Sequence, residues 1–113
     1  MLIFVKGHYL PLIASGQKTS TIRPWKVCRL RPGGTLVFNG KITTVITQVE
    51  QRRLGDLTAA DIKADGFASR ADFERAFHEH YPASTPNTVV WILRFHPPHS
   101  RRANATSSKT GPT

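Results

Sequence analysis

The sequence predicts a small α+β domain that is mostly β, with five strands and a few short helices. The clearest observation is Asn39-Gly40, which lies between two runs rich in β-branched and apolar residues, 35–38 and 41–49. Asn-Gly at such a place is a strong hairpin signal, because a type I′ turn needs positive φ at both central residues. A second observation is the near-continuous apolar run 89–95, which favours a closing strand in the centre of the sheet.

A third observation is a pair of helix signals in the second half of the chain. Thr58 and Asp61 form a capping-box-like start, and Gly66 is a matching stop, which predicts a helix of about two turns. Ser69 repeats the start signal for a second helix that ends near Tyr81. Both helices therefore lie between the fourth and fifth strands.

The first half supplies the other strands and one more helix. Residues 2–5 are an apolar run that predicts a buried opening strand. Residues 8–15 predict a short helix, with Gly16 placed where a helix is commonly closed in the left-handed conformation. Residues 19–23 are rich in β-branched side chains, and the proline that follows them predicts the end of that strand. In the run 41–49 both faces mix apolar residues with threonine, so alternation leaves open which face points inward.

Positive charge is unevenly distributed along the 113 residues, whose formal net charge is +9. Residues 1–53 hold nine Lys or Arg against one acid, giving +8, whereas residues 54–95 hold four against six, giving −2. A basic first half attracts polyanions through counterion release, so we expect RNA as a partner. The alternative is a basic surface that only keeps the protein soluble. A membrane is not expected as a partner, because no amphipathic basic helix accompanies the charge.

Cysteine and histidine usage indicates neither a disulfide nor a metal site. The lone Cys28 cannot form an intrachain disulfide, which favours a reducing compartment. His78 and His80 are two positions apart, so on a helix they project in different directions and do not share a metal ion. The apolar run 2–5 is too short for a signal peptide or a membrane span. We therefore expect a cytoplasmic protein without metal or cofactor, and the sequence does not indicate its oligomeric state.

Residues 97–113 are polar, basic and small, so they cannot bury enough apolar surface to repay their ordering entropy. We expect them to form a disordered basic tail, and residues 1–96 to form the domain.

The stretch 16–23 gathers groups that can do chemistry at the corner between the first helix and the following strand. A threonine hydroxyl such as that of Thr21 is a poor nucleophile until a base takes its proton. Lys18 can be that base only if burial or a neighbouring cation such as Arg23 lowers its pKa. Strict alternation places Lys18 opposite Thr21, so the two converge only if Lys18 lies in the corner before the strand begins. The alternatives are ordinary: a phosphate-binding lysine, a β-forming threonine and an arginine paired for structure.

A basic loop follows this stretch and offers a second set of candidates. Trp25 lies among cations and could stack a nucleobase, although a tryptophan that covers one end of the core is an equal alternative. The candidate binding residues for RNA or another substrate are Arg23, Trp25, Lys26, Arg29, Arg31, Arg52 and Arg53.

The pattern Gly16-x-Lys18-x-x-Thr21-x-Arg23 after a short helix resembles the signature of the ASCH domain family. The resemblance covers residues 1–96. It continues in the later stretches 54–58, 65–69 and 73–82. It implies a PUA-like fold, in which the five strands close into a small β-barrel, and an association with RNA.

Some small bacterial ASCH proteins are assigned as amidohydrolases that remove the acetyl group of N(4)-acetylcytidine with a lysine, a threonine and a glutamate. The resemblance implies Lys18 as base, Thr21 as nucleophile and Asp65 as proton donor, with the aspartate one methylene shorter than the family's glutamate. At a helix C-terminus the pKa of Asp65 should be raised, with Lys18 as the compensating cation. The alternative for Asp65 is a solvated helix-end residue. For the protein, the alternatives are a non-catalytic RNA-binding module that uses the same cleft, and a small ribonuclease.

Overall fold

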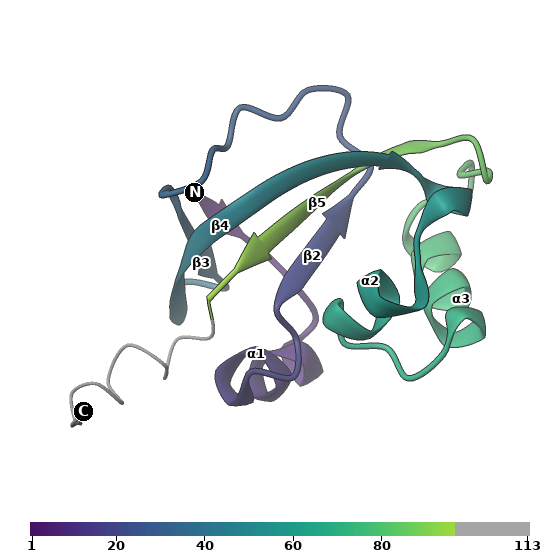
Figure 1. Cartoon of the computed structure of the whole chain (residues 1–113). Coiled ribbons are helices and arrows are strands. Elements are labelled where there is room, and N and C mark those ends of the chain that lie inside the picture. The colour runs from purple at the N-terminus through teal and green to yellow at the C-terminus, as the bar shows by residue number, and fades with distance from the viewer. Residues whose placement is uncertain (97–113) are drawn as a thin grey trace.

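A computed structural model describes residues 1–96 of the chain, so the predicted tail 97–113 lies outside the described residues. One five-stranded sheet carries the fold (Figure 1). Its strands are β1 (Leu2–Ile3), β2 (Ser20–Arg23), β3 (Thr35–Phe38), β4 (Ile42–Arg53) and β5 (Val89–Phe95). The helices are η1 (Gly7–Tyr9), α1 (Leu10–Ser15), η2 (Leu54–Asp56), α2 (Ala59–Ala64) and α3 (Arg70–His80). The prediction of an α+β domain with five strands is therefore confirmed, but the domain is not mostly β, because its helices hold as many residues as its strands.

The sheet is open, so the expectation of a closed barrel is not met. The strand order is β1-β3-β4-β5-β2, with β1 parallel to β3 and the other pairs antiparallel. No strand ladder within residues 1–96 joins the two edge strands, because β1 is only two residues long. Beyond it, the backbone of Val5 pairs with the side chain of Asn39 and not with a strand. Across the gap, Arg23 Nη2 donates to the Phe4 carbonyl at 3.1 Å.

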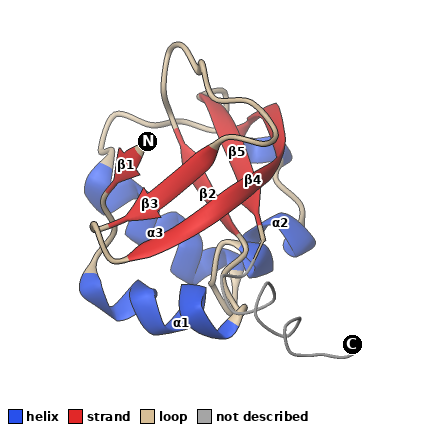
Figure 2. Cartoon of the chain, turned by 90° about the vertical axis from the view of Figure 1, so that its left-hand side faces the viewer, coloured by secondary structure: helices blue, strands red, loops and turns tan. Residues whose placement is uncertain are grey.

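The predicted hairpin is present and leads into the longest strand of the sheet. Asn39 and Gly40 have φ values of 54° and 70°, as the turn requires. Strand β4 runs for 12 residues and pairs first with β3 and then with β5. A register shift between Ile46 and Gln48 marks the place where it changes partner. Figure 2 shows β4 as a long strand of the sheet. Thr44 and Ile46 are the buried residues of β4, which settles the face that alternation left open.

Strand β5 divides the apolar core into two clusters. Its alternate residues face opposite sides, so Leu93 and Phe95 belong to one cluster while Val90 and Ile92 belong to the other. The first cluster also takes Ile3, Ile13, Leu36, Phe38 and Ile46. The second takes Ile22, Leu57, Ile62, Phe73 and Phe77, which joins α2 and α3 to the sheet. The central place predicted for residues 89–95 is confirmed.

Local signals set the helix ends as the sequence predicts. Thr58 and Asp61 make a complete capping box at the start of α2, and Ser69 accepts from a backbone N–H at the start of α3. Gly16 and Gly66 follow α1 and α2 with φ values of 86° and 98°, in the left-handed region that favours glycine.

Two buried hydroxyls provide a test of the packing. Ser20 and Thr44 are 0% and 1% exposed, but only Thr44 is satisfied, through Oγ1 donating to the Leu36 carbonyl at 3.0 Å. Within residues 1–96, Ser20 Oγ is a buried side-chain oxygen without a hydrogen-bond partner.

We expect Thr44→Val to lower the free energy of unfolding by about 1–2 kcal/mol, and Ser20→Ala to change it by less than about 0.5 kcal/mol or to raise it. Urea unfolding of both variants measures this, and a loss above about 1 kcal/mol for Ser20→Ala would contradict the packing described.

Candidate functional site

Lys18 lies in the corner between α1 and β2, where the sequence analysis required it. Its backbone N–H donates to the Leu12 carbonyl at 3.0 Å, and the next N–H, that of Thr19, donates to the Ala64 carbonyl at 2.7 Å. These bonds tie the corner to α1 and to α2, the two helices near the start of β2 in Figure 1. Strand β2 begins only at Ser20, so alternation does not separate Lys18 from Thr21. Both residues line one pocket.

Lys18 and Asp65 form a buried pair at the floor of this pocket. The lysine Nζ lies 2.6 Å from Asp65 Oδ1 and donates to the Asp65 carbonyl at 2.7 Å. The two residues are only 3% and 6% exposed, so the alternative of a solvated helix-end carboxylate is wrong. Gly66 packs against the lysine stem, since a Cβ there would lie 3.4 Å from Lys18 Cβ. The aspartate therefore reaches the lysine directly, although its side chain is shorter than glutamate.

Burial dominates the electrostatics of this pair. It lowers the pKa of Lys18, and the neighbouring charge of Arg23 lowers it further, while the attraction and hydrogen bond of Asp65 oppose the change. Burial likewise raises the pKa of Asp65, against the opposing effects of Lys18, Arg23 and a backbone hydrogen bond from Ile22. The direction agrees with the sequence analysis, but desolvation is the main cause and not the helix end. Both shifts bring the pKa values of the two groups closer to each other.

Thr21 and Arg23 complete the polar part of the pocket. Thr21 is 2% exposed, and its Oγ1 accepts a hydrogen bond from Arg23 Nε at 3.0 Å. The same guanidinium donates through Nη2 to the Phe4 carbonyl. Arg23 thus holds the threonine oxygen in place and leaves the hydroxyl hydrogen free to point elsewhere.

Aromatic side chains form the walls of the pocket, whose volume is about 360 Å³. The aromatic and histidine residues that line it are Phe4, Tyr9, Phe67, Phe73, Phe77, His80 and Tyr81. The Tyr9 ring centroid lies 5.3 Å from Lys18 Nζ, within the range of a cation–π contact. The sequence analysis missed these walls, because a helical stripe such as Phe73 and Phe77 also describes a helix packed on the core. Both functions hold here, since these two rings contribute to the core and to the pocket.

The residues predicted to bind in the basic loop lie apart from the pocket. The Trp25 carbonyl accepts from Trp91 Nε1 at 2.9 Å, and its side chain packs on the first apolar cluster, which favours the role of covering the core. Lys26, Arg29 and Arg31 are exposed and do not line the pocket. Their role in binding stays a prediction.

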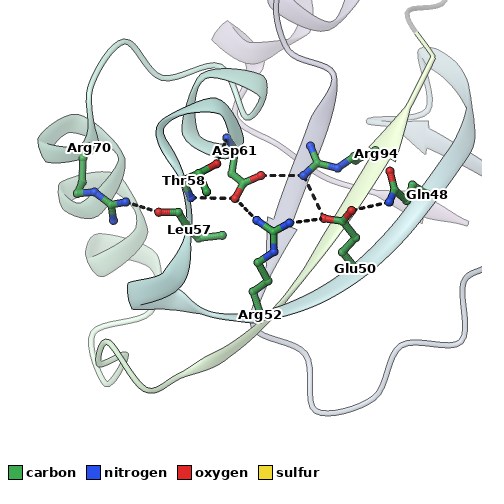
Figure 3. A network of polar contacts seen from close by, with 8 residues as sticks. All are labelled: Gln48, Glu50, Arg52, Leu57, Thr58, Asp61, Arg70 and Arg94. Atoms are coloured by element: carbon green, nitrogen blue, oxygen red, sulfur yellow. Dashed lines mark hydrogen bonds and ion pairs between the residues drawn. The ribbon is translucent and has the colours of Figure 1, made fainter.

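Arg52 takes part in a ring of ion pairs (Figure 3) that joins α2 to the sheet. It contacts Asp61 and also Glu50, the latter at 3.1 Å. Arg94 Nη2 bonds the same two acids, at 2.7 Å to Asp61 Oδ1 and 3.1 Å to Glu50 Oε1. Both carboxylates therefore lie between two guanidinium groups. Arg52 therefore forms ion pairs that stabilise the fold. Arg53 is largely exposed and forms a 3.6 Å pair with Asp56.

Asp61 is the buried member of this ring. Burial by itself would raise its pKa, but hydrogen bonds from Thr58 and Arg94 and the charge of Arg52 hold the pKa below its usual value. A depressed carboxyl pKa stabilises the fold above the unfolded-state value, and this contribution disappears as pH falls through the folded-state value.

We expect Asp61→Asn to lower the free energy of unfolding by about 2–3 kcal/mol at pH 7, because Arg52 and Arg94 each lose one of their two charged partners. The deficit should shrink as pH falls below about 4, where the parent carboxylate also becomes protonated. Asp56→Asn is the matched control, since its exposed pair should contribute less than about 0.5 kcal/mol. Chemical unfolding between pH 3 and pH 7 measures both, and a deficit for Asp61→Asn that does not depend on pH would argue against the ring.

Within residues 1–96, no helix is both long and apolar enough to cross a membrane. In the same part of the chain, no three or more His, Cys, Asp or Glu side chains are grouped so that they could hold a metal ion.

Comparison with known proteins places the fold. No family model matches the sequence, and no curated protein matches it. Among solved structures, the hypothetical protein PH0355 is similar with a TM-score of 0.72 at 16% identity, over 85% of this chain and 96% of that chain. The ASCH domain of Lactobacillus crispatus is similar with a TM-score of 0.64 at 17% identity, over 75% of this chain and 67% of that chain.

A third solved structure is a variant of ZmASCH from Zymomonas mobilis, with a TM-score of 0.63 at 10% identity, over 98% of this chain and 82% of that chain. The chain therefore has the fold of the solved ASCH domain structures, as the stretch 16–23 and its later companions predicted. At these identities the likeness concerns the fold alone.

Proposed function

We propose that this protein is an ASCH protein that binds RNA or a modified cytidine in the pocket above Lys18, and that it hydrolyses an acyl amide of the N(4)-acetylcytidine type. The observation that carries the proposal is the Lys18–Asp65 pair, which is buried at the floor of an aromatic-walled pocket beside the Thr21 hydroxyl. A pocket of about 360 Å³ lies within the usual range for small-molecule sites. Its aromatic walls suit a planar base.

The pair can supply a base and an acid at the same time. Ammonium beside carboxylate and amine beside carboxylic acid hold the same number of protons, and the burial of Lys18 and Asp65 moves their pKa values toward each other, which makes the second arrangement easier to reach. In that form Lys18 has a free electron pair to accept a proton, while Asp65 has a proton to give. No further cofactor is needed for acid–base chemistry of this kind.

The first step acylates the threonine. Lys18 takes the proton of the Thr21 hydroxyl as Oγ1 attacks the acyl carbon, and Asp65 gives its proton to the amine nitrogen of the base as the amide bond breaks. The products of this step are the free nucleoside amine, an ester on Thr21, a lysine ammonium and an aspartate carboxylate. Arg23, already bonded to Thr21 Oγ1, stabilises negative charge that develops there.

The second step restores the site. Water attacks the ester carbon and passes a proton to the Asp65 carboxylate, and Lys18 returns its proton to the Thr21 oxygen as the ester bond breaks. The acyl group leaves as a carboxylic acid. The pair is again an amine beside a carboxyl group, so protons and bonds balance over the cycle.

One observation favours the binding module as second candidate. Lys18 Nζ donates two hydrogen bonds to Asp65. The hydrogen bond that Thr21 Oγ1 accepts comes from Arg23 and not from the lysine. In this candidate the pair and Arg23 only shape and polarise the pocket for a base. The two candidates use the same cleft and differ in turnover.

Incubation with N(4)-acetylcytidine, and with single-stranded RNA that contains it, followed by product analysis, separates the candidates. We expect deacetylation by the parent, and a loss of at least about 100-fold in Lys18→Ala, Thr21→Ala and Asp65→Asn, because acid–base and nucleophilic groups contribute on this scale. The control is Lys63→Ala, an exposed lysine on α2, which should keep full activity. The activity of the parent should be bell-shaped in pH, since either a gained or a lost proton removes the acid–base pair.

Full activity of a site variant excludes the role assigned to that residue. If the parent retains RNA but never deacetylates it, the binding module replaces the enzyme. Cleavage of the RNA strand in place of deacetylation would identify a ribonuclease.

A further inference from the structure

An exposed aromatic ring stands at the mouth of the pocket. Phe4 is 66% exposed and lines the pocket, yet it belongs to neither apolar cluster. An exposed phenylalanine forgoes about 2 kcal/mol of the stabilisation that a buried one contributes, so the fold gains little from it. The stability of the fold therefore does not explain why the ring is exposed at this position.

The backbone beside this ring is nevertheless held firmly. Asn39 pairs with both polar groups of Val5, accepting from its N–H at 2.9 Å and donating to its carbonyl at 2.8 Å. Arg23 Nη2 holds the Phe4 carbonyl at 3.1 Å. These bonds come from the hairpin turn and from β2, so two separate elements fix the extended segment that presents the ring. Because the backbone that carries the ring is already held, binding at the ring does not have to order this segment.

Two cations line the pocket together with Phe4. Lys6 is exposed and also lines the pocket, on the same side of the extended segment as Phe4, and Arg23 lies against the Phe4 carbonyl. Among the acids of the described residues, only Asp65 lines the pocket, and Lys18 offsets its charge. An exposed ring with cations in the same pocket suits single-stranded nucleic acids, because bases stack on the ring while phosphates meet the charges.

We propose that Phe4 is a stacking platform for the nucleotide next to the one that enters the pocket, with Lys6 and Arg23 binding the phosphate between them. This rests on the proposed function, in that a base occupies the pocket. It goes further in naming the ligand class: single-stranded RNA, and not a free nucleoside. A free nucleoside has no second base and no phosphate, so it would leave the platform unused.

The test compares a trinucleotide RNA carrying N(4)-acetylcytidine at its centre with N(4)-acetylcytidine 5′-monophosphate, binding being measured by calorimetry. We expect the parent to bind the trinucleotide more tightly. Phe4→Ala should weaken trinucleotide binding by about 5- to 100-fold, since base–aromatic stacking contributes about 1–3 kcal/mol. Binding of the mononucleotide should change by less than about twofold, and Phe4→Trp should restore trinucleotide binding.

Leu2→Ala is the matched control, because Leu2 lies on the same edge of the sheet, is 55% exposed and does not line the pocket. It should leave both affinities unchanged. Lys6→Gln should make log affinity for the trinucleotide less steep in log salt by about 0.7, as expected for one lost phosphate contact.

Equal affinity of the parent for both ligands, or an unchanged trinucleotide affinity in Phe4→Ala, would overturn the platform. An equal loss for both ligands would place Phe4 in the pocket proper and would also overturn it. The measurement records binding and not turnover. A failure to deacetylate would therefore count against the proposed enzyme, while the binding result would still test the platform. A parent that binds neither ligand overturns both proposals.

Discussion

The contact between Lys18 and Asp65 is the constraint on which the site depends. It joins the corner before β2 to the residue that follows α2, and two backbone hydrogen bonds and the close approach of Gly66 support it on either side. Removing one partner of such a pair leaves an uncompensated buried charge, which typically costs about 3–5 kcal/mol. A buried ion pair is an expensive way to hold two elements together, and apolar residues would do so at least as well. Its place at the floor of a pocket is therefore better explained by chemistry than by stability.

Ion pairs between the basic first half and the acidic second half of the chain account for part of their opposite charges. The second half is acidic, and two of its carboxylates, Asp61 and Asp65, pair with Arg52 and Lys18 from the basic first half. Helix α2 has six residues and would be marginal alone, but each of these ion pairs secures one of its ends. The ring around Asp61 therefore positions the helix that carries Asp65 to the site. Among the described residues of the first half, six cations have no ion pair with an acid, and such a set is suited to binding a polyanion. They are Lys6, Arg23, Lys26, Arg29, Arg31 and Lys41.

Local signals made most of the elements predictable. The Asn39-Gly40 turn, the cap at Thr58 and the glycine stops act through neighbouring residues, so a sequence reveals them directly. The expected closure of the barrel is not seen. The pairing of β1 stops at Ile3, and the Asn39 side chain bonds the N–H and carbonyl of Val5 in place of a strand. A side chain that takes the place of a pairing strand in this way has no recognisable sequence pattern.

The site was predictable in its polar residues and not in its setting. Lys18 and Thr21 could be predicted because they lie three positions apart in one short stretch of sequence. The burial of Asp65 could not, because it follows from tertiary packing beside the lysine stem. The aromatic walls escaped notice because a helix that lines a pocket and a helix that packs on a core share one periodicity. Arg52 shows the reverse case, since a basic residue in the sequence gives no sign that Glu50 and Asp61 bind it within the fold.

The most direct test of the account is an NMR titration of the Lys18 ammonium nitrogen and the Asp65 carboxyl carbon in the same sample. If the pair shares its protons, both signals should move together in each of two pH steps, one below the usual lysine value of about 10.4 and one above the usual aspartate value of about 3.9. Independent titration of Lys18 and Asp65, each close to its usual value, would contradict the account, because the pair would then have no acid and base to offer at neutral pH.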